Sequence, residues 1–74
     1  MDKKIVGILR DFLDEKQIES LSPSSKLSEF GISSLIMMEV ISRIEDEFGI
    51  TIPIERAMKF STIGDFLDAI NEKH

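Results

Sequence analysis

The sequence of 74 residues contains no cysteine, and its single histidine, His74, is the last residue. Without cysteine there is no disulfide, no thiolate nucleophile and no cysteine-based zinc site. A lone terminal histidine is a poor basis for a metal site or a catalytic base, since chain ends are the least ordered part of most domains. These absences argue against a metalloprotein and against thiol or serine–histidine hydrolase chemistry.

Long apolar runs and an excess of basic residues are also missing. No apolar stretch approaches the roughly 20 residues that span a bilayer, and Gly7 interrupts the short apolar segment near the N-terminus, which does not resemble a signal peptide. The 14 acidic residues outnumber the 9 basic ones, which gives a net charge of −5. A nucleic-acid partner would require a basic face. We therefore expect residues 1–74 to form a single domain, a cytoplasmic monomer that neither enters a membrane nor binds nucleic acid.

Apolar residues at helical spacing predict a first helix from residue 2 to about residue 16, with charged residues on its opposite face. Its apolar face consists of Ile5, Val6, Ile8, Leu9, Phe12 and Leu13. A long connection, from about residue 17 to residue 33, follows and contains Pro23. We expect its apolar residues to hold it against the helices; they are Ile18, Leu21, Leu27, Phe30 and Ile32.

The pattern predicts a second helix from Ser34 to about Phe48, ended by Gly49. Its core-facing stripe comprises Met37, Val40, Ile41, Ile44 and Phe48. An extended linker with Ile50 and Ile52 turned inward, and a short helix within 54–59, should follow. We expect the end of the bundle to be covered by Ala57, Met58 and Phe60. A capping sequence at Thr62–Asp65 opens a last helix to about Asn71. The predicted fold is all-α, a small four-helix bundle of three main helices and one short helix.

The start of the second helix is the candidate functional site. Ser33 and Ser34 have the side chains that cap helices, and a hydroxyl there lies beside the positive end of the helix dipole, where a phosphate is favourable. Leu35 and Met38 lie off the core stripe and indicate a small docking surface, with packing against the long connection as the alternative. The acidic residues of this helix indicate recognition by basic enzymes rather than an ordinary solvated face; they are Glu39, Glu45, Asp46 and Glu47.

Other chemistry finds no support in the sequence. There is no Walker-type glycine-rich loop, and the spacing of metal-binding loops is absent. Solvated helix faces explain the carboxylates better than an acid–base pair in a cleft does. We predict that the protein is not an enzyme.

The ordered set of Gly31-Ile32-Ser33-Ser34-Leu35, then Glu39, then the segment 45–53 resembles the acyl carrier protein family over nearly the whole chain. The resemblance implies that a phosphopantetheinyl transferase attaches 4′-phosphopantetheine from coenzyme A to Ser34, and that the arm then holds acyl groups as thioesters. It implies that the transferase, and acyl-loading and chain-elongating enzymes with basic patches, contact Leu35, Met38, Glu39, Glu45 and Asp46. It also implies a space for the acyl chain lined by Met37, Val40, Ile44, Ile52 and Ile63, with plain core as the alternative for each residue.

Two positions depart from the family pattern. Ser33 stands where the family has aspartate, and Ile36 replaces a residue that is commonly acidic or polar. These departures, and a resemblance to polyketide carriers, favour a carrier of a dedicated pathway over the general carrier of fatty acid biosynthesis. Two alternatives stay open: a peptidyl or aminoacyl carrier with the same arm, and an unmodified helical bundle that only binds partners.

Overall fold

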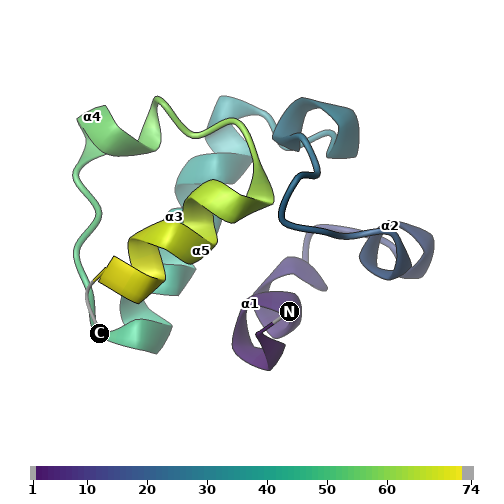
Figure 1. Ribbon diagram of the computed structural model, residues 1–74, viewed down its shortest axis with the longest axis horizontal. Helices are drawn as coiled ribbons and strands as arrows, with labels where there is room; N and C mark the ends of the chain where they lie inside the picture. The colour runs from purple at the N-terminus through teal and green to yellow at the C-terminus, as the bar shows by residue number, and fades with distance from the viewer. Residues whose placement is uncertain (1, 73–74) are drawn as a thin grey trace.

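The computed structural model describes residues 2–72, which form five α-helices and one 3₁₀ turn (Figure 1). In chain order these are α1 Lys3–Leu9, α2 Glu15–Glu19, η1 Leu27–Phe30, α3 Ser34–Phe48, α4 Ile54–Ala57 and α5 Ile63–Glu72. Strand pairing within residues 2–72 is limited to an isolated antiparallel bridge between Lys26 and Thr62. The predicted all-α class is confirmed. His74 lies outside the described residues.

The central element is α3, which has the predicted bounds. It begins after Ser33 and ends at Gly49, whose φ of 64° is the left-handed conformation that closes many helices. The predicted stripe faces the core: four of its residues are buried, and Phe48 is half-buried against them. The apolar faces of α1 and α5 complete the core, with Ile5, Leu9 and Phe66 fully buried. Periodicity and the signals at the two helix ends therefore placed the main helix and its inner face correctly.

The prediction of one helix over residues 2–16 is wrong in its second half. The helix α1 ends at Leu9, and the carbonyl of Leu9 accepts the N–H groups of both Phe12 and Leu13 at 2.9 Å. Asp14 is extended, with ψ of 172°, and α2 begins directly after it. Phe12 and Leu13 still pack into the core, as their place on the apolar face predicts.

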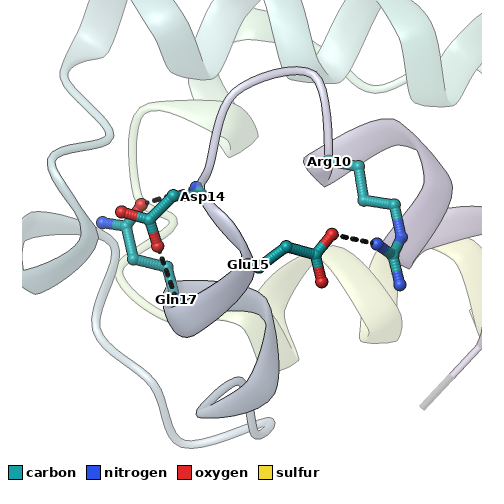
Figure 2. Close-up of polar contacts among 4 residues, drawn as sticks. All are labelled: Arg10, Asp14, Glu15 and Gln17. Carbon is teal, nitrogen blue, oxygen red and sulfur yellow. Dashed lines mark hydrogen bonds and ion pairs between the residues drawn. The ribbon is translucent and has the colours of Figure 1, made fainter.

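A capping box explains the break, as Figure 2 shows. Asp14 Oδ1 accepts the N–H of Gln17 at 2.8 Å, and Gln17 Oε1 accepts the N–H of Asp14 at 3.0 Å. This pair satisfies two amide groups that the start of a helix otherwise leaves without partners. An ion pair between Arg10 and Glu15 spans the turn (Figure 2). The local start signal at Asp14 thus prevails over continuation of the amphipathic pattern.

The connection between α1 and α3 holds more regular structure than the sequence predicted, since it contains α2 and η1. Its expected apolar contacts are confirmed: Leu27 and Ile32 are buried, and the other three residues pack half-buried against the core. Backbone hydrogen bonds tie it to the start of α5. The Leu27 N–H donates to Ser61 O at 2.9 Å, and the Ile63 N–H donates to Ser25 O at 3.0 Å. The connection is therefore fixed at the end of the molecule where α3 begins.

The linker after α3 runs along one side of the molecule and brings α4 back towards the start of α3 (Figure 1). Ile52 is buried and Ile50 half-buried, as predicted. Ala57 is fully buried, and the ring of Phe60 packs edge-on against Phe66 at 5.4 Å. The prediction for Met58 is wrong, because its side chain is 73% exposed.

The short length of α4 accounts for the position of Met58. Ala57 takes the inward position, and the next residue lies about 100° further round the helix. Met58 therefore faces outward, beside the start of α3.

No helix within residues 2–72 is long and apolar enough to cross a membrane. In the same part of the chain, no group of three or more histidine or acidic side chains is placed to hold a metal ion.

Candidate functional site

The two serines at the start of α3 have different positions. Ser33 is the N-cap: its backbone is extended, its Oγ accepts the N–H of Ile36 at 3.3 Å, and its carbonyl accepts the N–H of Met37 at 2.8 Å. Ser34 is the first helical residue and is exposed. Since Ser33 caps the helix, the hydroxyl of Ser34 is available for another role.

The surroundings of Ser34 suit a phosphate ester. The amide groups of Ser34 and Leu35 belong to the first turn of a 15-residue helix, where N–H groups have no acceptor within the helix. These groups carry the partial positive charge of the helix dipole and favour an anion close by. Gly31, with φ of 71°, turns the chain from η1 towards this helix start. The residues present therefore fit a phosphate attached to the Ser34 oxygen.

Ser34 also lies on the edge of two grooves. The first is apolar and has a volume of about 260 Å³; it is lined by Ser34, Met37, Met38, Ile54 and Met58. The second lies towards η1, has a volume of about 240 Å³ and has more polar residues along it, among them Ser28 and Ser61. A group attached to Ser34 can reach either groove, but only the first offers a predominantly apolar surface along α3 and α4.

The predicted recognition residues occupy three kinds of position. Leu35 is 73% exposed, and Glu39 is exposed one helical turn further on, so the two share a face of α3. Asp46 is exposed nearer the end of the helix. Met38 is half-buried and lines the apolar groove. Glu45 is half-buried, and its Oε2 accepts the N–H of Ile52 at 2.7 Å, so one of its carboxylate oxygens serves the fold. Their role with partners stays a prediction.

Two further side chains of α3 shape this face. Ile36 is half-buried and packs against the core, so it adds little to the exposed apolar surface. Arg43, the one basic residue of the helix, pairs with Asp11, and its guanidinium lies 5.7 Å from the ring centre of Phe12. Both contacts direct the positive charge towards the turn after α1. The exposed carboxylate of Glu39 is thus not neutralised by Arg43.

The five residues expected to line an acyl space are not brought together around one cavity. Val40, Ile44 and Ile63 are fully buried, and Ile52 is 6% exposed. Of the five, Met37 reaches both grooves beside Ser34. For the other four, this structure shows plain packed core. Whether the core opens around an acyl chain stays a prediction.

Two groove residues were not expected from the sequence. Ile54 is 57% exposed and Met58 is 73% exposed, and both line the apolar groove from α4. In the segment after Pro53 the inward position goes to Ala57, and the larger apolar residues fall on the other face. A helix of one turn is too short for periodicity to reveal this.

The pKa of the Asp65 carboxyl is lowered, chiefly because its carboxylate accepts backbone hydrogen bonds from Ser61 and Thr62. The N–H groups of Ser61 and Thr62 lie 2.7 and 3.0 Å from Asp65 Oδ2. One of the two hydrogen bonds of the predicted capping box is confirmed, namely the bond in which the Asp65 carboxylate accepts the N–H of Thr62. This clamp holds the chain where Ser61 borders the second groove.

Comparison with known proteins gives consistent matches. The family model that describes a phosphopantetheine attachment site matches residues 3–70. The chain is 33% identical over 73 residues to an acyl carrier protein of Rickettsia bellii (strain RML369-C), an alignment that covers 97% of this chain and 84% of that protein. It is 35% identical over 71 residues to an acyl carrier protein of Thermosynechococcus vestitus, with 96% of this chain and 88% of the relative covered.

Proposed function

Because the chain belongs to the acyl carrier protein family, which bears a covalent 4′-phosphopantetheine, we propose that Ser34 is the residue that carries this arm. The main support for the proposal is that the two serines occupy different positions at the start of α3. Ser33 Oγ is hydrogen-bonded as the helix cap, whereas Ser34 is exposed at the same helix end. As a member of this family the protein is a carrier and not an enzyme.

The residues of the chain have three tasks towards the arm. Ser34 Oγ forms the ester bond to the phosphate. The amides of Ser34 and Leu35, with the helix dipole, stabilise its negative charge. Ser33 keeps the helix start in place. The arm supplies the terminal thiol on which acyl groups are held as thioesters, a group that a chain without cysteine lacks.

Membership of the family implies interaction with a phosphopantetheinyl transferase and with biosynthetic enzymes. We propose that these partners contact the face of α3 formed by Leu35 and Glu39, with Asp46 and the groove residue Met38 beside it. An exposed apolar side chain one turn from an exposed carboxylate suits a partner with an apolar spot flanked by basic residues. Glu45 contributes less than its sequence position predicted, because it accepts the Ile52 N–H.

Attachment can be tested by intact mass. The chain is incubated with coenzyme A and a broad-specificity transferase, in parallel with the Ser34→Ala and Ser33→Ala variants. We expect a gain of one phosphopantetheine that is lost in Ser34→Ala and kept in Ser33→Ala. No gain with several transferases would support the unmodified, partner-binding bundle instead. A gain lost in Ser33→Ala and kept in Ser34→Ala would move the site by one residue.

We further propose that residues 1–74 act as one carrier domain, a cytoplasmic monomer, for acyl groups of fatty acid, polyketide or related lipid biosynthesis. The relatives' shared name, acyl carrier protein, favours acyl over aminoacyl cargo. Support for a dedicated pathway now rests on Ser33 and on the resemblance to polyketide carriers, since Ile36 packs against the core. Loading trials with malonyl, fatty-acyl and aminoacyl donors distinguish these cargoes, and light scattering measures the mass of the particle.

A further inference from the structure

The guanidinium of Arg43 is held away from the acidic residues of its own helix. Arg43 lies four residues after Glu39 and four before Glu47, the spacing at which side chains of a helix meet and opposite charges pair. Within the part of the chain that the structure describes, it forms its ion pair instead with Asp11, in the turn after α1, at 2.5 Å. Its guanidinium also lies 5.7 Å from the ring centre of Phe12, within the range of a cation–π contact.

We propose that Asp11 and Phe12 determine partner specificity: they form a holding site for Arg43, which leaves Glu39 free to pair with a basic partner. The partner is the phosphopantetheinyl transferase, or another enzyme that docks on the same face of α3 through basic side chains. The inference rests on the proposed function, because it requires that this face is the docking surface and that Ser34 accepts the arm. It adds two residues from another element of the fold.

Without the holding site, Glu39 is the favoured alternative for Arg43. A pair with the acid four residues before the base stabilises a helix more than the reverse order does, so Glu39 is a better partner than Glu47. Glu39 is exposed on the proposed docking face, one turn after Leu35. A guanidinium at this place would neutralise the carboxylate that attracts basic side chains, and it would repel them.

The holding site acts on the position of a charge more than on the stability of the fold. The side chains of Arg43 and Asp11 are 44% and 59% exposed, and exposed ion pairs add little to stability. The pair with Glu39 is equally weak, however, so the additional contact with the Phe12 ring is enough to favour the holding site.

The backbone places the holding site before any partner arrives. The carbonyl of Leu9 accepts the N–H groups of Phe12 and Leu13, both at 2.9 Å, which fixes the turn after α1. Phe12 packs half-buried against the core, so its ring has a defined position beside α3. Arg43 therefore has a preformed place to occupy, and its guanidinium does not have to be displaced when a partner approaches Glu39.

The test measures attachment of the arm to the whole chain by a phosphopantetheinyl transferase, with the chain as the varied substrate. We expect Asp11→Asn to lower kcat/KM about twofold to fivefold at low ionic strength, the effect of one exposed charge pair, and to act through KM with kcat unchanged. The difference should disappear at high salt, because exposed charges are then screened. A loss in kcat, or a loss that persists at high salt, would overturn the holding site.

Glu15→Gln is the matched control for the loss of a negative charge. Glu15 is also exposed and forms an ion pair, with Arg10, but this pair lies away from α3 (Figure 2). We expect Glu15→Gln to keep kcat/KM close to that of the unaltered chain. Equal losses in Asp11→Asn and Glu15→Gln would show that net charge and not the position of Arg43 matters, and would overturn the inference.

A double variant separates the freed guanidinium from the missing carboxylate. If Arg43 causes the loss, Asp11→Asn combined with Arg43→Gln regains the kcat/KM of the unaltered chain. A double variant as slow as Asp11→Asn would overturn the holding site, because the transferase would then depend on Asp11 itself. NMR reports the position of Arg43 directly: the Phe12 ring shifts the signals of its side-chain protons, and this shift should diminish in Asp11→Asn. An unchanged shift would also overturn the inference.

The outcomes distinguish this inference from the proposed function. A chain that accepts no arm from any transferase overturns Ser34 as the attachment site. A Glu39→Gln variant with unchanged kcat/KM overturns the docking face, and the inference falls with it. If Glu39→Gln lowers kcat/KM and Asp11→Asn does not, the holding site alone is overturned, and the attachment site and the docking face stand.

Discussion

Glu45 and Ile52 are joined across the turn that ends α3, where Oε2 of Glu45 accepts the Ile52 N–H at 2.7 Å. The carbonyl of Glu45 also accepts the N–H of Ile50 at 3.2 Å. One residue therefore fixes two points of the linker that leads to α4. A carboxylate acceptor strengthens such a bond, and loss of the acceptor leaves a partly buried amide without its partner.

Replacement of Glu45 tests this contact. We expect Glu45→Ala to lower the free energy of unfolding by about 1–3 kcal/mol, because the half-buried Ile52 N–H loses a charged acceptor. Urea denaturation at neutral pH measures the change. Asp46→Ala is the matched control, since it removes the same charge from a neighbouring exposed residue near the negative end of the helix dipole. Equal losses in the two variants would show that charge and not the contact matters.

The lowered pKa of Asp65 predicts the direction of one pH effect. Its ionised form accepts the N–H groups of Ser61 and Thr62 in the folded state, and its ordinary pKa is near 3.8. The folded state therefore binds this proton more weakly than the unfolded state. The contribution of Asp65 is complete well above pH 3.8 and is lost as the pH falls through the lowered pKa.

Asp65→Asn should remove that contribution. We expect it to lower stability at neutral pH by about 1 kcal/mol, the usual effect of a helix cap, and to reduce the loss of stability on acidification. Urea unfolding from about pH 7 to about pH 3 measures both effects. Asp68→Asn, an exposed position on the same helix, is the control. A slope with pH that is unchanged in Asp65→Asn would contradict the prediction.

Periodicity and end signals predicted the parts of the fold that bury long stripes. The bounds of α3, its inner face and its stop at Gly49 all follow from patterns that extend over several turns. The break before Asp14 was not predicted. It depends on a four-residue cap, which competes with an amphipathic pattern that continues on both sides of it.

The candidate site could be predicted only in part, because some of its features depend on local sequence and others depend on the placement of distant segments. The position of Ser34 at the start of a helix follows from local sequence, and so does the cap at Ser33. The groove beside Ser34 does not, because it requires α4 to return from the far end of α3 and to place Met58 outward. Long-range placement of a one-turn helix leaves no periodic signal. The hydrogen bond from Ile52 to Glu45 could not be predicted from the sequence either, because an acidic side chain within a run of acidic residues is usually exposed to solvent.

Two glycines should respond in opposite directions to the same substitution. A Cβ added to Gly64 would lie 2.9 Å from the carbonyl oxygen of Pro23, which also accepts the Gly64 N–H at 2.8 Å. Gly64→Ala therefore forces two backbone segments apart, and we expect it to cost about 1–3 kcal/mol. Nothing lies within 4 Å of a Cβ at Gly7 in α1, so Gly7→Ala should stabilise by about 0.5–1 kcal/mol. Thermal unfolding of both variants checks the signs, and a stabilised Gly64→Ala would show that the connection yields at Pro23.

Ser33 holds the end of α3 with a rather long hydrogen bond, 3.3 Å from its Oγ to the N–H of Ile36. Aspartate at this position caps equally well and adds a negative charge at the positive end of the helix dipole. We therefore expect Ser33→Asp to raise the stability of the unmodified chain by about 0.3–1 kcal/mol. Ser33→Ala, which lacks the acceptor, should lower it by about 0.5–1 kcal/mol.

The attached arm should diminish the gain from aspartate. A phosphate on Ser34 already places negative charge at this helix end, and a carboxylate at position 33 would be repelled by it. We expect the stability gain of Ser33→Asp to be smaller in the modified protein than in the unmodified protein, as measured by urea denaturation of both forms. Ser42→Asp, at an exposed position in the middle of the same helix, adds the same charge away from the dipole and serves as the control. If the gain of Ser33→Asp is the same in both forms, the phosphate does not lie at the start of α3.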